Sequence, residues 1–201
     1  ISPGKITFYC FNAMAKFKAE LVQLWVAILK EVPDSRLLLK NTALTDKEIQ
    51  KQLLRAFRKH GIGAKRLMLH GRLASQRDHL ALYNQVDIAL DSYPYNGTTT
   101  SFEALWMGVP VLSLYGQLHA SRVGLSILTA VGLEDLTAST PKHCIGIAKD
   151  LAADQPRLEH LRMSLRDLVQ HRLCDAERFT FEVEAAFRDI WQQWCDKHPA
   201  S

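Results

Sequence analysis

Short apolar runs alternate along the chain with longer segments in which apolar residues recur every three to four positions. The first run, at residues 6–11 (ITFYCF), is rich in β-branched and aromatic residues and is predicted to be a strand. The segment 18–32 that follows has the i, i+3, i+4, i+7 spacing of a helix with one buried face. Strands separated by helices of this length predict a parallel sheet covered by helices on both faces.

The same alternation continues to about residue 140, and only helical patterns follow it. The predicted strands are the runs at 6–11, 37–39, 67–69, 86–90, 109–114 and 136–137. The predicted helices lie at 18–32, 45–60 (with Thr45 and Glu48 as a capping box), 75–85, 99–107, 121–130, 141–153, 156–171 and 176–196. We therefore expect an α/β fold with a Rossmann-like, doubly wound parallel sheet over residues 1–140. The helical tail at 141–201 is expected to pack on the same domain.

Composition narrows the class of protein. Hydrophobic residues make up 47% of the 201 residues, enough for a real core, and the net charge of +4 fits an anionic small ligand better than nucleic acid. The four cysteines form no paired motif and no run of about 18 apolar residues exists, so we expect a reduced, cytoplasmic protein without a membrane span. The chain begins at Ile1 rather than Met, which suggests a piece of a longer polypeptide, with N-terminal processing as the alternative.

The loop that leaves the fourth predicted strand carries an unusual run of hydroxyls. Asn96 and Gly97 form a turn signal, and Thr98, Thr99 and Thr100 follow where a helix should begin. In doubly wound sheets, ligands bind beyond the carboxyl ends of the strands, and a helix N-terminus attracts anions. The run can therefore hold a phosphate group, or it can simply cap the helix.

Three further residues have two interpretations each. Thr100 and Glu103 have the spacing of a capping box, but a carboxylate at Glu103 could also accept hydrogen bonds from a ribose diol. Lys16, in the loop after the first strand, could neutralise a diphosphate, although a single lysine is more often only solvated. Asn12, in the same loop, could be turn chemistry alone. The histidines show no metal-ligand spacing, so we expect no bound metal.

Three blocks of the sequence resemble a known family. They are "CFNAMAKFKAELVQLWVAILKEVPDSRLLLK", "RLASQRDHLALYNQVDIALDSYPYNGTTTSFEALWMGVPVLSL" and "ASRVG". In this order they resemble the C-terminal catalytic lobe of the O-linked N-acetylglucosamine transferases, the SPINDLY-like family 41 of glycosyltransferases. That family is metal-independent and inverting, and its two-lobed fold is of the GT-B type. The resemblance covers nearly the whole chain.

The resemblance implies a role for particular residues. It places Lys16 at the diphosphate of a UDP-sugar, where Lys16 would stabilise the leaving group. It places Ala74 and His79 at the uracil, the segment from Asn96 to Thr100 at the phosphates and Glu103 at the ribose. The vertebrate relatives differ at four positions: they have His for Thr98, Asp for Glu103, Lys for Gln76 and Gln for Ala13.

The resemblance also implies parts that these 201 residues lack. The family's N-terminal lobe carries the main catalytic base, and helical TPR repeats that select protein acceptors precede it. The final helix would lean toward that lobe through a face formed by Phe179, Val183, Phe187, Ile190, Trp191 and Trp194. The expected function is the UDP-sugar-binding half of a protein O-glycosyltransferase, without a separate cofactor, and the fragment alone is expected to be inactive. The alternatives are a non-catalytic nucleotide-binding or scaffolding module, or another GT-B activity such as an N-glucosyltransferase or a UDP-sugar epimerase.

Overall fold

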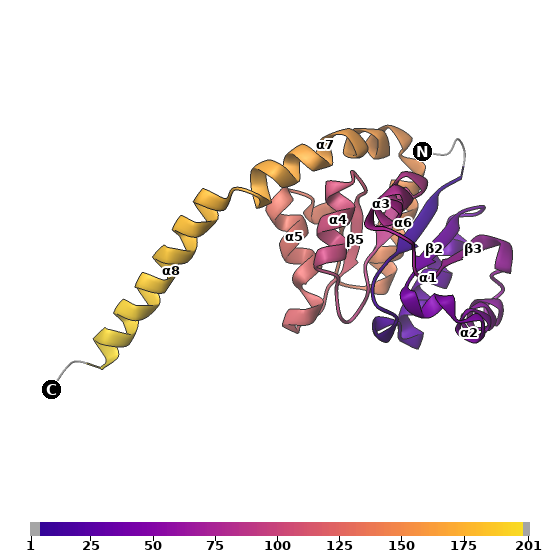
Figure 1. Ribbon diagram of the computed structural model, residues 1–201, viewed down its shortest axis with the longest axis horizontal. Coiled ribbons are helices and arrows are strands. Elements are labelled where there is room, and N and C mark those ends of the chain that lie inside the picture. The colour runs from indigo at the N-terminus through magenta and orange to yellow at the C-terminus, as the bar shows by residue number, and fades with distance from the viewer. Residues whose placement is uncertain (1–4, 199–201) are drawn as a thin grey trace.

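The protein is described by a computed structural model in which residues 5–198 are placed (Figure 1). The strands are β1 (Thr7–Cys10), β2 (Arg36–Lys40), β3 (Leu67–His70), β4 (Ile88–Leu90), β5 (Val111–Leu114) and β6 (Thr137–Ala138). The helices are α1 (Ala19–Glu31), α2 (Lys47–Arg58), α3 (Gln76–Ala81), α4 (Thr99–Trp106), α5 (Val123–Val131), α6 (Pro141–Ala153), α7 (Gln155–Leu173) and α8 (Ala176–Lys197). Short 3₁₀ segments lie at Met14–Lys16, Thr42–Thr45, Ala64–Arg66, Leu82–Gln85, His119–Ser121 and Glu134–Leu136. All six predicted strands and all eight predicted helices are present, with small shifts at their ends.

The six strands form one parallel sheet in the order β3-β2-β1-β4-β5-β6. The chain first moves outward from β1 to β3, then returns to β4 and moves outward in the other direction. Because parallel crossovers are right-handed, this reversal places α1 and α2 on one face of the sheet and α4 and α5 on the other. The switch point, where a doubly wound sheet opens toward a ligand, therefore lies between β1 and β4.

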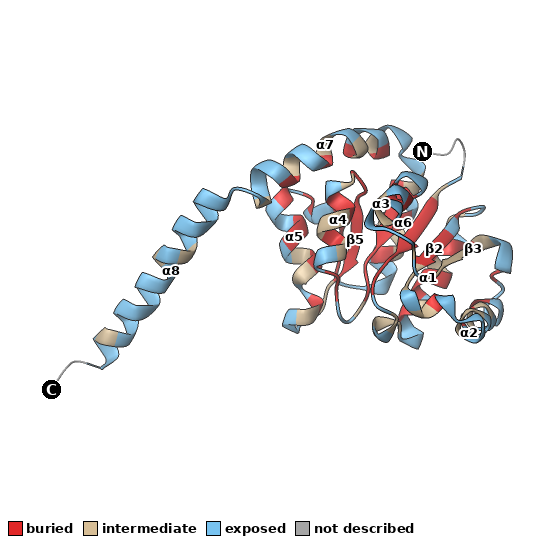
Figure 2. Cartoon of the chain, in the orientation of Figure 1, coloured by how far each residue is buried: buried red, intermediate tan, exposed pale blue. Residues whose placement is uncertain are grey.

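The core is formed by the sheet and the apolar stripes of the helices that cover it (Figure 2). Residues of β1, β4 and β5 are buried throughout, as expected for strands covered on both faces. Trp25 and Ile28 of α1 are fully buried. Arg162 of α7 donates hydrogen bonds to the carbonyl oxygens of Tyr83 and Met107, at 3.0 and 3.3 Å, and so fastens α7 across the ends of two neighbouring segments.

The start of α2 differs from the prediction. Asp46, not Thr45, caps this helix, and its carboxylate accepts hydrogen bonds from the backbone N–H groups of Glu48 and Ile49. The Thr45 hydroxyl instead accepts a hydrogen bond from the backbone N–H of Arg72, at 3.1 Å. The predicted capping box is therefore wrong, because a neighbouring loop takes up the Thr45 hydroxyl and the adjacent Asp46 is an equally good cap.

The helical tail is divided between two environments. α6 packs on α1 and on β5, and α7 packs on α4, α5 and α6. α8 extends away from the sheet (Figure 1) and has no buried residue. The expectation that all of 141–201 packs on the same domain is therefore wrong for α8. Residues 1–4 of the predicted sheet domain and residues 199–201 of the predicted tail lie outside the described residues.

Candidate functional site

The loops that follow β1 and β4 meet at the switch point of the sheet. The register pairs Phe8 with Ile88, so these two strands end side by side and their loops are neighbours. Three hydrogen bonds join these loops. The Lys16 ammonium donates to the carbonyl oxygen of Asn96 at 2.8 Å, the Thr100 hydroxyl donates to Asn12 Oδ1 at 2.7 Å, and the Asn12 amide donates to Asp91 Oδ1 at 3.3 Å. The structure thus brings together the predicted residues from the two loops.

The N-terminus of α4 is the part of this site where an anion would lie. α4 begins at Thr99, and its N-cap residue Thr98 makes no side-chain capping bond. Thr98 and Thr99 are exposed, and the first N–H groups of a helix have no intrahelical partner. The proposed capping box is wrong, since the hydroxyl of Thr100 is used by Asn12 and Glu103 bonds elsewhere. The first turn therefore exposes backbone N–H donors and the side chains of Thr98 and Thr99 to solvent.

Lys16 lies beside this helix end and is half-buried. Its ammonium group sits 3.9 Å from the ring centre of Tyr95, in a cation–π contact, in addition to its bond to the Asn96 carbonyl. Burial lowers the pKa of Lys16, and the nearby Asp91 acts in the opposite direction. The contact with Tyr95, which holds the positive charge next to the loop, was not predicted from the sequence.

Glu103, His79 and Tyr83 form a polar cluster one turn further along α4. Glu103 Oε2 lies 3.2 Å from His79 Nε2 and accepts a hydrogen bond from the Tyr83 hydroxyl, also at 3.2 Å. Burial and the Glu103 carboxylate raise the pKa of Tyr83. The His79 ring also packs against Phe11, with ring centres 5.5 Å apart, and its Nδ1 has no partner within the described part of the chain. If Nε2 carries the proton, Nδ1 is left as a hydrogen-bond acceptor.

Ala74 and His79 line one open pocket of about 350 Å³, with both polar and apolar walls. Its other walls come from the ends of β2 and β3 and the start of α3: Lys40, Thr42, Arg72, Leu73, Ser75 and Gln76. The bond between His79 and Glu103 connects this pocket to α4. Ala74 and His79, which the resemblance assigned to the uracil, therefore share a pocket. That pocket adjoins α4, the helix that the resemblance assigned to the phosphates and the ribose.

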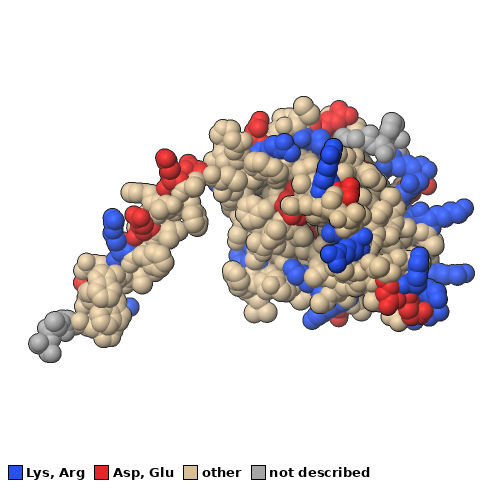
Figure 3. Space-filling model, in the orientation of Figure 1, with Lys and Arg blue, Asp and Glu red and all other residues tan. Residues whose placement is uncertain are grey.

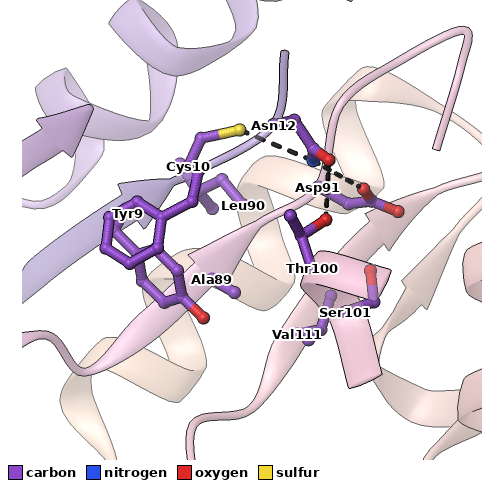
Figure 4. Close-up of a pocket in the computed structure, with 10 residues that line it drawn as sticks. Tyr9, Cys10, Asn12, Ala89, Leu90, Asp91, Thr100, Ser101 and Val111 are labelled. Carbon is purple, nitrogen blue, oxygen red and sulfur yellow. Dashed lines mark hydrogen bonds between the residues drawn. The ribbon is translucent and has the colours of Figure 1, made fainter. Parts of the chain in front are cut away.

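Asp91 is the site residue that sequence reasoning missed. The structure buries it under the loop, where it accepts four hydrogen bonds. The one from Asn12 is drawn in Figure 4. A small hollow of about 10 Å³ lies among Asp91, Asn12 and Thr100. That space holds at most one water molecule, so a larger ligand would lie outside this layer, on the exposed start of α4.

Surface charge is uneven. Lys and Arg gather at the end of the molecule that carries α2 (Figure 3), where Lys47, Lys51, Arg55 and Arg58 lie on one helix. Among residues 5–198, no group of three His, Cys, Asp or Glu side chains is arranged to hold a metal ion. No helix in the same range combines the length and apolar character that crossing a membrane requires.

A sheet with this strand order and with polar loops gathered at its switch point defines the class: a Rossmann-like lobe of the kind found in GT-B glycosyltransferases. A family model described as glycosyl transferase family 41 matches residues 2–183. The chain belongs to this family.

Several known proteins are similar to nearly all of the chain. The "probable UDP-N-acetylglucosamine–peptide N-acetylglucosaminyltransferase SPINDLY" of Hordeum vulgare is 42% identical over 197 residues, which are 98% of this chain and 21% of the relative. The relative of the same name from Arabidopsis thaliana is 39% identical, over 97% of this chain and 21% of its own length. The chain thus spans about a fifth of the length of these curated relatives.

Solved structures agree with the fold. A mutant O-GlcNAc transferase of Thermobaculum terrenum superposes with a TM-score of 0.89 at 39% identity, covering 96% of this chain and 37% of that one. HepE of Anabaena, solved with UDP and glucose, has a TM-score of 0.64 at 14% identity and covers 92% of this chain and 48% of its own. At that identity the second likeness concerns the fold alone.

Proposed function

We propose that this chain is the UDP-sugar-binding half of a protein O-glycosyltransferase that transfers N-acetylglucosamine to Ser or Thr hydroxyls. The observation that carries the proposal is the exposed N-terminus of α4 with Lys16 beside it, linked through Glu103 and His79 to the pocket of Ala74. The three parts of UDP would lie in order along a continuous surface: the uracil in that pocket, the ribose near Glu103 and the diphosphate at Thr98–Thr100. The relatives from Hordeum vulgare and Arabidopsis thaliana are named as probable transferases of the same sugar to peptides.

The chemistry assigned to this half is stabilisation of the leaving group. When the sugar leaves, negative charge builds on the diphosphate of UDP. The positive end of α4 and the Lys16 ammonium lie where they would stabilise this charge without a metal. The base that activates the acceptor hydroxyl, and the inverting geometry, are assigned to the part of the parent protein that precedes this chain.

The exposed face of α8 fits a contact with that preceding part. Phe187, Ile190 and Trp191 are 67%, 63% and 64% exposed, and Phe179, Val183 and Trp194 lie on the same face of the helix. A stripe of this size on a helix normally packs against another surface. We assign it to the N-terminal lobe of the parent protein, and the protein acceptor to the repeats beyond that lobe.

Calorimetric titration with UDP tests the binding claim. The chain should bind UDP saturably, and Lys16→Ala should weaken binding about tenfold, which corresponds to about 1.4 kcal/mol. Lys30→Ala, on the exposed end of α1, is the matched control and should bind like the wild type. Absence of UDP binding at millimolar concentration would overturn the proposal for this chain.

A sugar-transfer assay on the parent protein separates catalysis from binding. Transfer from UDP-N-acetylglucosamine to a peptide should require both halves of the protein. If the chain binds UDP but the parent protein transfers no sugar from any UDP-sugar, a non-catalytic nucleotide-binding module is the correct interpretation. Transfer to another class of acceptor would indicate a different GT-B activity.

A further inference from the structure

Asp91 is the first residue after β4, at the switch point of the sheet, and its side chain meets only hydrogen-bond donors. Oδ1 accepts from the backbone N–H of Gly97 at 2.7 Å, the backbone N–H of Ser92 at 2.8 Å and the amide of Asn12 at 3.3 Å. Oδ2 accepts from the Ser113 hydroxyl at 2.8 Å. The residue is 6% exposed, so these donors, rather than water, satisfy the carboxylate.

The four donors come from three segments of the chain: the loop after β4, the loop after β1, and β5. Ser92 and Gly97 are the two ends of the loop after β4, so one oxygen atom closes this loop at both ends. Asn12 comes from the loop after β1, and its own Oδ1 accepts the hydroxyl of Thr100. Asp91 therefore reaches the first turn of α4 through Asn12 (Figure 4).

The surroundings leave Asp91 no room to touch a ligand. A Cβ on Gly124, at the start of α5, would lie 2.0 Å from Ser113 Oγ and 2.8 Å from Asp91 Oδ2, so only glycine allows α5 to approach this closely. The backbone N–H of Gly124 donates to Asn96 Oδ1 at 3.3 Å, which ties α5 to the same loop. Burial raises the pKa of Asp91 to about 6. The hydrogen bonds that Asp91 accepts from Gly97, Ser113 and Ser92, and the charge of Lys16, act in the opposite direction.

We propose that Asp91 is the positioning residue of the nucleotide site: its carboxylate oxygens fix the loop 92–97 and, through Asn12, the hydroxyl of Thr100. This inference rests on the proposed function, because the surface that it positions is the one assigned to the diphosphate. Asp91 acts as an acceptor of hydrogen bonds, not as a charge presented to the ligand.

If Asp91 acts only as a hydrogen-bond acceptor, its replacement by asparagine and by alanine should have different effects. In Asp91→Asn, the amide oxygen can take the place of Oδ1 and accept the same three donors, while the amide nitrogen donates to Ser113 Oγ. In Asp91→Ala, the N–H groups of Ser92 and Gly97 lose their acceptor, and so does Asn12. The asparagine variant should therefore preserve the site, and the alanine variant should lose it.

Asp87, at the other end of β4, is a matched control. It lies just before β4, is 4% exposed, and holds the backbone N–H of Thr7 at 2.8 Å through Oδ2. It thus has the burial and the backbone contact of Asp91, but at the opposite edge of the sheet. Asp87→Ala should lower stability without affecting the nucleotide site.

The experiment combines UDP calorimetry with amide hydrogen exchange measured by NMR on the unliganded chain. Asp91→Ala should raise the Kd for UDP at least about tenfold and speed exchange of the Gly97 amide, whereas Asp91→Asn and Asp87→Ala should keep the Kd within about threefold. If Asp91→Ala does not fold, Asn12→Ala takes its place, because it breaks the connection to Thr100 but leaves the carboxylate.

The outcomes distinguish this inference from the proposed function. If the wild type binds UDP and the alanine variant binds it equally well, or the asparagine variant loses as much as the alanine variant, the positioning role is overturned and the proposed function stands. If the wild type binds no UDP, the proposed function falls together with the nucleotide part of this inference. The exchange rates then still decide whether Asp91 orders the loop.

Discussion

In the loop after β4, the buried polar side chains find their partners inside the chain, whereas on α8 the large apolar side chains face solvent. The carboxylate of Asp91 and the amide of Asn96 each bond to several segments of the lobe. On α8, by contrast, Trp191 and Trp194 stack on each other, with ring centres 5.4 Å apart, and are more than half exposed. The buried polar groups of the loop after β4 are satisfied within this chain, whereas the exposed apolar face of α8 has the composition of an interface. Under the proposed function, nucleotide binding and docking would therefore be separate tasks of the two regions.

The largest expected effect comes from filling the space around Gly97. A Cβ there would lie 2.4 Å from Thr100 Oγ1 and 2.8 Å from Asn12 Oδ1, so Gly97→Ala must push the loop away from α4. We expect a loss of about 3 kcal/mol in the free energy of unfolding and of measurable UDP binding.

Gly146→Ala is the control for this change, because nothing lies within 4 Å of a Cβ at that position in α6. It should be neutral or stabilise the chain by up to about 1 kcal/mol, as Ala does in place of Gly in a helix. Chemical denaturation and calorimetry measure both variants. Equal stability of the two variants would mean that the loop is not the closely packed region described.

The second effect is a pH dependence from Asp91. Because its pKa is raised from 3.8 to about 6 in the folded state, the folded state holds the proton more tightly than the unfolded state, and stability is lost as the pH rises between these values. Asp91→Asn does not titrate, so its advantage over the wild type should be about 2 kcal/mol larger at pH 7 than at pH 4.

Urea denaturation of both proteins across this pH range measures the difference. Lys16, the charged group that acts on Asp91, is present in both proteins. A difference in stability that does not vary with pH would show that the carboxylate is not penalised by burial.

A smaller effect is expected at Glu103 of α4, which bonds to His79 of the pocket that Ala74 also lines. Glu103→Ala removes the acceptor shared by His79 and Tyr83, and it leaves the buried Tyr83 hydroxyl without a partner. We expect a loss of about 1–2 kcal/mol in the free energy of unfolding. Glu184→Ala, an exposed carboxylate on α8, should change it by less than about 0.5 kcal/mol. Thermal denaturation of the two variants decides this point, and equal losses would contradict it.

The smallest effect is predicted for α8 itself. Truncation after Leu173 removes a helix without a buried residue, so the free energy of unfolding of the lobe should change by less than about 0.5 kcal/mol. The affinity for UDP should stay the same, while solubility should improve because the exposed aromatic side chains are gone. A marked loss of stability would show that α8 packs on the lobe in solution, contrary to the division between the two regions.

The sequence predicted the elements of the fold because its periodicity is strong in each of them. Alternating β-rich runs and helical stripes are local signals, and the strands that they predicted are all present in the sheet. α8 was the exception, because an apolar stripe has the same pattern whether its own lobe or another surface covers it. The periodicity therefore predicted the helix but not its environment, and the expectation that this face is a docking surface came from the resemblance alone.

The sequence predicted which loops meet, but not the bonds between them. The rule that ligands lie at the switch point selected two loops that the structure brings together, and ligand binding there stays a prediction. The rule could not tell which of three consecutive threonines caps α4, because all three have the same capping chemistry. Asp91 was missed since a carboxylate after a strand has no sequence signal that separates an internal acceptor from a ligand; the Asn-Gly turn six residues later was the only hint.

Calorimetric titration of the 201-residue chain with UDP and, in parallel, with uridine tests most directly whether the nucleotide site is complete in this chain. If the start of α4 and Lys16 hold the diphosphate, UDP should bind saturably below millimolar concentration and uridine at least about tenfold more weakly. Equal affinity for the two ligands, or no heat of binding with UDP at millimolar concentration, would contradict the claim that this site holds the diphosphate.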